Sequence, residues 1–180
     1  MYINVEYSWK FQETFFPRQD YQKLQQESNI LQQTLNKHGN QIQSKIKHNT
    51  GLTWKHENLT VWLFKGSAPS ISKPVMINTL HKNQKTILFL VIHELHHVIL
   101  RDTVWIKNIE PRYQEALINT SSKHIFEKIT KTNLTPILDS VGGNTYHKEA
   151  WQIATNIGTL TKKLPAYTKQ DIEYYNDTYP

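Results

Sequence analysis

An apolar run of residues, Thr86–Leu100, carries four ionisable side chains near its middle: His93, Glu94, His96 and His97. Apolar residues fall on nearly every face of a helix drawn through this run, which predicts a buried helix rather than a surface helix. The four polar positions interrupt the run, so it does not match a membrane-spanning helix, which needs about 20 apolar residues in succession. Because a buried ionisable group is costly unless it is paired or bound to a metal, these side chains need partners within the fold.

Two of the histidines, His93 and His97, have the spacing of metal ligands on a helix. Residues four apart project from one helix face, one above the other, so both imidazoles can bind a single zinc ion. Glu94 follows His93 directly and can act as a general base. His96 sits about 60° from the line that joins the two histidines, so we expect it beside the site or partly exposed, not as a ligand. Hydrogen-bonded core histidines are the alternative explanation of the pair.

The rest of the chain divides into an N-terminal part with strands and a C-terminal part made mainly of helices. Alternating apolar residues predict strands, and helical spacing of apolar residues predicts helices, with Gly39, Pro111 and Pro165 as boundaries. The predicted strands cover 1–7, 59–64 and 75–78, and the predicted helices cover about 20–37, 41–48, 83–101, 111–131 and 145–163. This order predicts an α+β fold with a small mixed sheet, followed by the HExxH helix and further helices.

We expect a single domain over 1–180, because the length fits one domain and no linker divides it. Residues of about 1–82 form its N-terminal α/β part, and 83–163 form the helical part with the metal site. The segment 164–180 is a tail to which the sequence assigns no structure.

The composition narrows the chemistry further. The 180 residues include no cysteine, which excludes disulfides, thiolate zinc ligands and thiol nucleophiles.

The N-terminal segment lacks the basic and apolar regions of a signal peptide, so we expect a cytoplasmic protein. The net charge of +6 is spread along the chain without a block of like charges, so we expect neither a nucleic-acid nor a membrane partner. The sequence leaves the oligomeric state open.

The string His93-Glu94-Leu95-His96-His97 resembles the active-site helix of zincins, the HExxH metallopeptidases. In zincins a pair of strands precedes this helix, and here LTVWLF and VMIN precede it in that order. The longer string HELHHVILR is also similar to the HExHH-containing family of uncharacterised, predicted zinc-dependent proteases. The resemblance implies a zincin-like fold, bound Zn²⁺, and hydrolysis of a peptide or protein substrate by a zinc-bound water with Glu94 as general base. It also implies that an extended substrate adds to a strand, at Leu59–Phe64 or Val75–Asn78.

Zincin subgroups differ in their third metal ligand. Metzincins would have Gly at position 100 and His or Asp at position 103, where this chain has Leu100 and Thr103. Peptide deformylases use a cysteine, which is absent. The remaining resemblance is to gluzincins, in which a glutamate on a later helix completes the site.

Two glutamates match the gluzincin pattern. Glu115, in the string EALI, follows the motif at nearly the spacing of aminopeptidase-like and thermolysin-like gluzincins. Glu149, in the string HKEAW, is similar to the glutamates of gluzincins with longer insertions. Each lies in line with apolar residues of its own predicted helix. We favour Glu115 as the third ligand and keep Glu149 open, with His124 or Asp139 as further alternatives.

A tyrosine or histidine near the cleft often stabilises the oxyanion in such enzymes, and Tyr146 is our first candidate, followed by His147 and Tyr113. Two functions of other classes stay open. The first is a zincin fold that acts as a binding or regulatory module without catalysis. The second is a nucleic-acid-binding protein, which only the net charge suggests.

Overall fold

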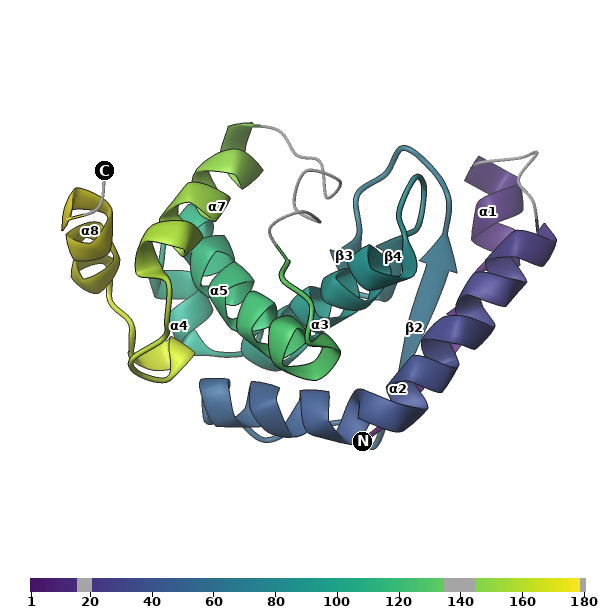
Figure 1. Cartoon of the computed structure of the whole chain (residues 1–180), viewed down its shortest axis with the longest axis horizontal. Coiled ribbons are helices and arrows are strands. Elements are labelled where there is room, and N and C mark those ends of the chain that lie inside the picture. The colour runs from purple at the N-terminus through teal and green to yellow at the C-terminus, as the bar shows by residue number, and fades with distance from the viewer. Residues whose placement is uncertain (16–20, 135–144, 179–180) are drawn as a thin grey trace.

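A computed structural model of the chain describes residues 1–15, 21–134 and 145–178. Its elements are β1 (Tyr2–Tyr7), α1 (Trp9–Phe15), α2 (Tyr21–Thr50), β2 (Asn58–Phe64), β3 (Ile71–Ser72), β4 (Val75–Asn78), α3 (Gln84–Leu100), α4 (Val104–Asn108), α5 (Pro111–Thr130), α7 (Thr145–Ile157), the short 3₁₀ helix η1 (Leu164–Ala166) and α8 (Lys169–Thr178). They form a mainly helical α+β fold with one four-stranded sheet, as predicted (Figure 1). No helix within the described ranges is long and apolar enough to cross a membrane.

The sheet has the strand order β1-β2-β4-β3. Strands β1, β2 and β4 are parallel, and β3 runs antiparallel to β4. Strand β1 pairs with β2 along its whole length, from Tyr2 opposite Asn58 to Tyr7 opposite Leu63. Parallel neighbours need long connections, and α2 provides the connection between β1 and β2. The predicted small mixed sheet is therefore confirmed.

The two outer strands of the sheet differ in how they are covered. Gln32 of α2 accepts a hydrogen bond from Val5 N at 2.7 Å and donates one to Ile3 O at 3.0 Å, so α2 covers the edge of β1. The other outer strand is β3, while β2 lies inside the sheet and β4 pairs with β2 and β3. A substrate strand therefore cannot add to Leu59–Phe64, because β1 and β4 occupy both edges of β2. At Val75–Asn78, β3 pairs with Val75 and Met76, so strand addition at β4 stays a prediction for the remaining residues only.

Helix α3 crosses the middle of the molecule, with the sheet on one side and α5 and α7 on the other (Figure 1). One apolar cluster lies among the sheet, α2 and α3, and a second joins α4, α5, α7 and α8. Ile99 of α3 and Trp151 of α7 pack against both clusters. Twelve of the seventeen residues of α3 are buried, which confirms the predicted buried helix.

Most of the predicted elements are present with small shifts of their ends. The predicted strands at 1–7, 59–64 and 75–78 correspond to β1, β2 and β4, and the predicted helices at 83–101 and 111–131 correspond to α3 and α5. The sequence missed α1, β3 and α4, which are all short.

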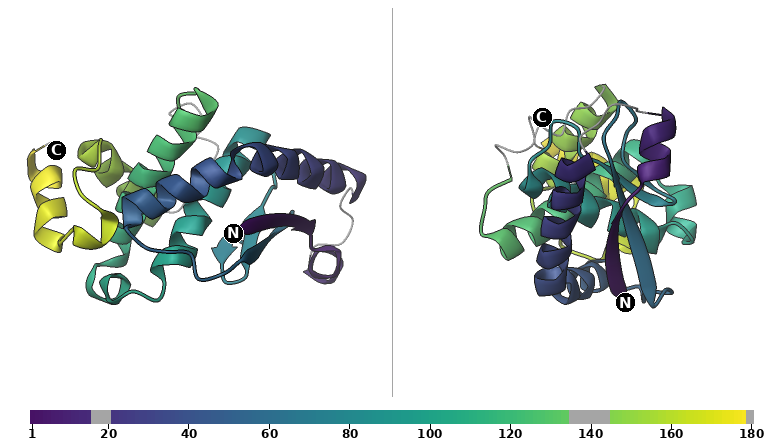
Figure 2. Two further views of the ribbon diagram at one scale, coloured as in Figure 1. Left: turned by 90° about the horizontal axis from the view of Figure 1, so that it is seen from below. Right: turned by 90° about the vertical axis from the view of Figure 1, so that its right-hand side faces the viewer.

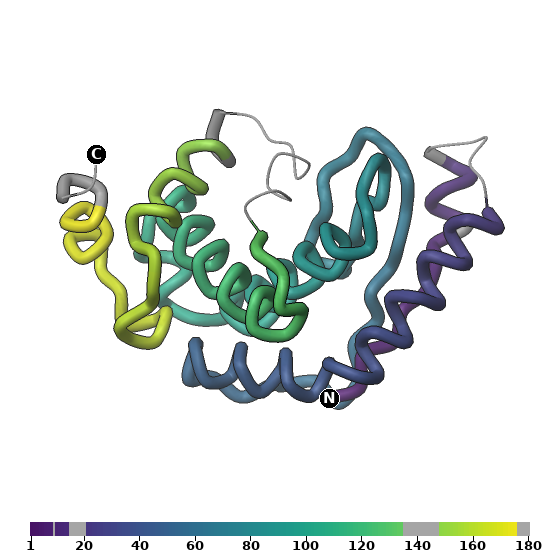
Figure 3. The backbone as a smooth tube through the Cα atoms, in the orientation of Figure 1, coloured from purple at the N-terminus to yellow at the C-terminus, as the bar shows by residue number. Residues whose placement is uncertain are grey.

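Helix α2 is one continuous helix, whereas the sequence predicted two, at 20–37 and 41–48, divided at Gly39. The observed helix has 30 residues and passes through Gly39, which is buried. Leu35 and Ile42, on either side of this glycine, pack in the same core cluster. Packing on both sides therefore outweighs the helix-propensity cost of glycine, about 1 kcal/mol. The helix crosses the face of the molecule seen in the left view of Figure 2, and it bends along its length in Figure 3.

The C-terminal part also differs from the prediction. Helix α7 ends at Ile157, not near residue 163, because Gly158 follows it with a φ of +62°, a conformation that favours glycine at a helix end. Pro165 lies in η1 and does not end α7.

The unassigned tail contains α8, which begins with a reciprocal pair of hydrogen bonds. Thr168 N donates to Asp171 Oδ2 at 2.7 Å, and Asp171 N donates to Thr168 Oγ1 at 3.3 Å.

Replacement of Gly39 by alanine should raise the free energy of unfolding by about 0.5–1 kcal/mol. A Cβ at Gly39 would meet only Gln43 Nε2, at 3.8 Å, and alanine reduces the conformational entropy of the unfolded chain. Urea denaturation measures the change. Gly51→Ala is the control and should destabilise the protein, because Gly51 has a φ of +71° and its Cβ would lie 2.8 Å from Lys163 Cδ. A loss of stability in Gly39→Ala would contradict the conclusion that packing outweighs an unfavourable helix propensity at this position.

Candidate metal centre

Helix α3 carries the HExxH residues through the middle of the fold. Asn83 caps its start, where the side chain accepts a hydrogen bond from Thr86 N at 2.9 Å. Further along the helix, His93 and His97 face α5 together. Their Nε2 atoms lie 3.1 Å apart and their ring centroids lie 4.8 Å apart. Two ring nitrogens at this distance are close enough to bind the same ion.

Glu115 of α5 meets the two histidines. Its Oε1 lies 3.1 Å from His97 Nε2, and its Oε2 lies 3.3 Å from His93 Nε2. The side chains of His93, His97 and Glu115 are only 12%, 20% and 15% exposed. Within the described residues, they are the one group of three histidine or carboxylate side chains whose ligand atoms could hold a metal ion.

The separations of these atoms fit a tetrahedral zinc ion. Zinc binds imidazole nitrogen and carboxylate oxygen at about 2.0–2.1 Å, so two of its ligand atoms lie roughly 3.3 Å apart. Here the two Nε2 atoms are 3.1 Å apart, and each lies 3.1 or 3.3 Å from its nearer Glu115 oxygen, Oε1 for His97 and Oε2 for His93. One ligand atom from each of the three residues lies within 4.8 Å of the other two. Three protein ligands leave a fourth position for another molecule, as in catalytic zinc sites. His93, His97 and Glu115 therefore have the ligand chemistry for one zinc ion and lie close enough together to share it.

The charges around the site favour a cation at its centre. Burial alone would lower the pKa of His93, but the hydrogen bond with Glu115 and the charges of Glu115 and Glu94 raise it above its usual value. Burial alone would raise the pKa of Glu115, but hydrogen bonds from His93 and His97 hold it far below its usual range. The carboxylates thus compensate for the cost of positive charge in a buried place, which is what a metal ion requires.

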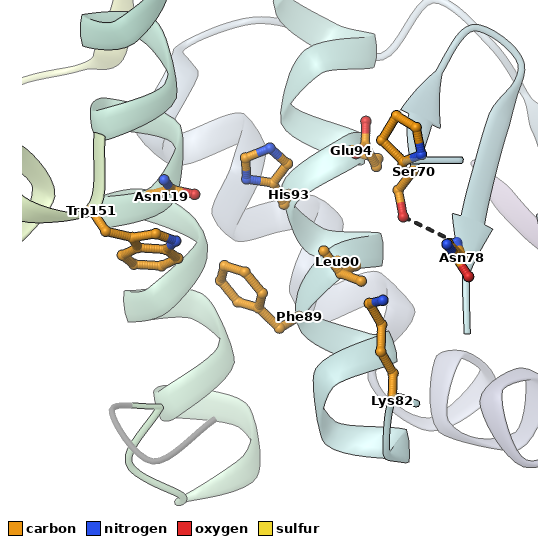
Figure 4. A pocket seen from close by; sticks show the side chains of 10 residues that line it. Ser70, Asn78, Lys82, Phe89, Leu90, His93, Glu94, Asn119 and Trp151 are labelled. Atoms are coloured by element: carbon orange, nitrogen blue, oxygen red, sulfur yellow. Dashed lines mark hydrogen bonds between the residues drawn. The ribbon is translucent and has the colours of Figure 1, made fainter. Parts of the chain in front are cut away.

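Glu94 lies in the wall of a cavity of about 160 Å³ next to His93 (Figure 4). The side chain of Glu94 is buried. The cavity is lined by Phe89, Leu90, His93 and Glu94 of α3, by Asn119 and Trp151 on one side, by Pro69, Ser70 and Asn78 on the other, and by Lys82. One candidate metal ligand and the candidate general base therefore share one small space.

The other candidates from the sequence do not join this site. Glu149 is exposed on α7, because the following turns of that helix bury their alanine and isoleucine side chains instead, so Glu115 and not Glu149 meets the histidines. His124 is exposed on α5 and lines a different cavity, between α2 and α5. Tyr113 is buried in the apolar cluster of α4, α5 and α7.

Three further candidates lie outside what the structure describes. Asp139 falls in the range 135–144, and the side chains of Tyr146 and His147 are also outside the described part of the chain. The role of Tyr146 in stabilising an oxyanion stays a prediction.

His96 is fully buried and makes its own hydrogen bonds apart from the metal group. The expectation of partial exposure is therefore wrong. Its Nδ1 lies 2.8 Å from Ile92 O, and because a carbonyl only accepts, Nδ1 carries the hydrogen. Its Nε2 then accepts a hydrogen bond from the Ser121 hydroxyl at 2.7 Å, and Ser121 Oγ accepts one from Asn49 Nδ2 at 2.8 Å. Burial lowers the pKa of His96 to about 3, so a neutral imidazole links α3 to α5 and, through Asn49, to α2.

Asn119 is a residue near the site that the sequence analysis missed. It is buried on α5, one turn after Glu115, and its side chain faces the ring of His93 in Figure 4. His93 Nδ1 is buried and has no hydrogen-bond partner in the described part of the chain. A metal-binding histidine usually donates its second N–H to a nearby oxygen, and the Asn119 amide is placed to accept it. The spacing of four residues from Glu115 is the sequence signal that could have revealed Asn119.

No known protein family, curated protein or solved structure matches this chain. The function is therefore inferred from the residues of the site and from their geometry.

Replacement of Ser121 by alanine should lower the free energy of unfolding by about 1–3 kcal/mol, because it leaves buried polar groups of His96 and Asn49 without their partner. Chemical denaturation measures the loss. Ser122→Ala is the matched control. Ser122 Oγ is a second partner of His96 Nδ1, at 3.2 Å, and Nδ1 keeps its bond to Ile92, so we expect a loss below about 1 kcal/mol. Equal losses in the two variants would contradict the hydrogen-bond chain described above.

Proposed function

We propose that this chain is a zinc-dependent metallopeptidase with a zincin-type site. His93, His97 and Glu115 hold the zinc ion, and Glu94 is the general base. The observation that carries the proposal is the group of His93, His97 and Glu115, whose ligand atoms lie within 4.8 Å of one another, beside a buried carboxylate that lines a cavity. The strands that precede α3 in the chain are consistent with a zincin-like arrangement.

The residues of the site divide the chemistry between them. Zinc, when bound, supplies a Lewis acid that polarises a carbonyl group and makes water more acidic. Glu94 accepts the proton of the attacking water and returns it to the amine that leaves. Glu94 is only 7% exposed, so bulk water competes little for its carboxylate, and electrostatic interactions are stronger there than at the surface.

The surroundings of the cavity support a peptide as the substrate. Its volume of about 160 Å³ is smaller than that of pockets for drug-sized ligands, which measure roughly 300–1,000 Å³. It therefore has room for one part of an extended chain. Pro69 and Ser70 line it and directly precede the outer strand β3, so the main chain of a peptide can pair with this edge.

The metal content of the purified protein tests the metal site. Elemental analysis of dialysed, zinc-reconstituted wild type should find about one zinc per chain. His97→Ala and Glu115→Ala should lose most of it, because each removes one of the three ligands. Glu149→Ala is the matched control and should keep its zinc, since Glu149 is exposed on another helix. Circular dichroism should first show that each variant is folded. Wild type without bound zinc would overturn the proposal.

Peptide hydrolysis tests the catalytic part separately. Zinc-loaded wild type should cleave members of a mixed peptide pool, with the products detected by mass spectrometry. Glu94→Gln should keep its zinc and lower kcat by about 10²–10⁴-fold, because an amide cannot accept the proton. Zinc binding without hydrolysis by wild type would overturn the peptidase proposal and favour a binding or regulatory module.

A further inference from the structure

The cavity beside Glu94 has a lysine at its other end. Lys82 directly precedes the N-cap of α3, and Figure 4 shows its side chain running along the helix as far as Leu90. Glu94 lies one turn further along the same helix. Among the described residues that line the cavity, Lys82 is the one lysine or arginine.

Asn78 holds the turn that carries Lys82. The side-chain oxygen of Asn78 accepts a hydrogen bond from Leu80 N at 2.9 Å, and its amide group donates to Gly66 O at 2.6 Å on the opposite loop. Next in the turn, His81 has a φ of +58°, which is uncommon for a residue other than glycine. The backbone therefore fixes the point from which the Lys82 side chain starts, and such constrained backbone is concentrated at functional sites.

The ammonium group of Lys82 has only a weak partner in the described structure. Its Nζ donates to Leu80 O at 3.3 Å, and no carboxylate of the described residues lies within ion-pair distance of it. Burial lowers the pKa of Lys82 below its usual value. A partly buried cation is costly until an anion joins it, so an anionic ligand gains affinity at this point.

We infer that Lys82 binds a carboxylate of the substrate, so that the site prefers peptides with an anionic group within about two residues of the scissile bond. The inference rests on the proposed peptidase function. The lysine side chain ends next to Leu90, which lies about 6 Å from Glu94 along the helix axis. An extended peptide advances about 3.3–3.6 Å per residue, so about two residues span this distance. The carboxylate can belong to an aspartate or glutamate side chain or to a free C-terminus.

The distribution of charge supports this recognition. Glu94 repels a substrate carboxylate at one end of the cavity, and Lys82 attracts it at the other. Leu90 lies between them along α3, and the rings of Phe89 and Trp151, 5.7 Å apart, line another part of the same cavity (Figure 4). An apolar wall excludes water and strengthens the attraction between ammonium and carboxylate.

Binding to the zinc-loaded Glu94→Gln variant tests the inference without turnover. Three pools of short acetylated peptides share the same randomised neutral positions. The first pool contains one glutamate and an amidated C-terminus, the second has glutamine in place of the glutamate, and the third has this glutamine and a free C-terminal carboxylate. We expect the first or the third pool to bind about 10–100-fold more tightly than the second, and the pool that does so identifies the source of the carboxylate.

The same titrations with further variants assign the preference to Lys82. Lys82→Met keeps the apolar stem and should reduce the preference to about 1, whereas Lys82→Arg should retain it. Lys85→Met is the matched control, since Lys85 is exposed in the first turn of α3 and should leave the preference unchanged. Equal binding of the three pools, no binding of any pool, or a preference that persists in Lys82→Met would each overturn the inference.

Hydrolysis of the second, neutral pool by wild type separates this inference from the proposed function. Cleavage of that pool together with equal binding of all pools would leave the peptidase in place and reject the role of Lys82. A preference that depends on Lys82 without any hydrolysis would keep the carboxylate site and reject the peptidase.

Discussion

Burial of two imidazoles and a carboxylate in the middle of an apolar helix is unfavourable unless other groups meet them. For the two imidazoles of α3 the charged partner is Glu115, whose carboxylate contacts both His93 and His97. This contact ties α3 to α5 through charge in addition to apolar packing. A change that moved the two helices apart would remove the Glu115 carboxylate from both histidines, so the spacing of the helices and the geometry of the donors depend on each other.

One helix supplies the partners for most of these buried groups. On α5, Glu115 meets His93 and His97, Asn119 faces the ring of His93, and Ser121 bonds to His96. The residues between Glu115 and Asn119 pack into the second apolar cluster. Helix α5 therefore has one face that matches the polar residues of α3 and another that belongs to the core, and this division explains how a mainly apolar fold accommodates a polar centre.

The sequence predicts local features well and spatial partners less well. The HExxH spacing lies within one helix, so His93, Glu94 and His97 could be recognised from the chain alone. The choice between Glu115 and Glu149 needed the fold, because both lie on amphipathic helices and only the packing of α5 against α3 brings one of them to the histidines. The predicted helix end at Gly39 was wrong because the low helix propensity of glycine is a local property, whereas packing contacts on both sides of Gly39 stabilise a continuous α2. Lys82 had no sequence signal, since its position depends on a turn held by Asn78.

The parallel pairing of β1 with β2 has a consequence for the order of folding. Tyr2 lies opposite Asn58, so this pair closes a loop that contains the whole of α2. His97 and Glu115 are much closer in the chain and are separated mainly by the short helix α4. Closing the longer loop costs about 1 kcal/mol more chain entropy than closing the shorter one. The helical unit that carries His93, His97 and Glu115 therefore has the lower contact order, and completion of the sheet around α2 is the slower topological step.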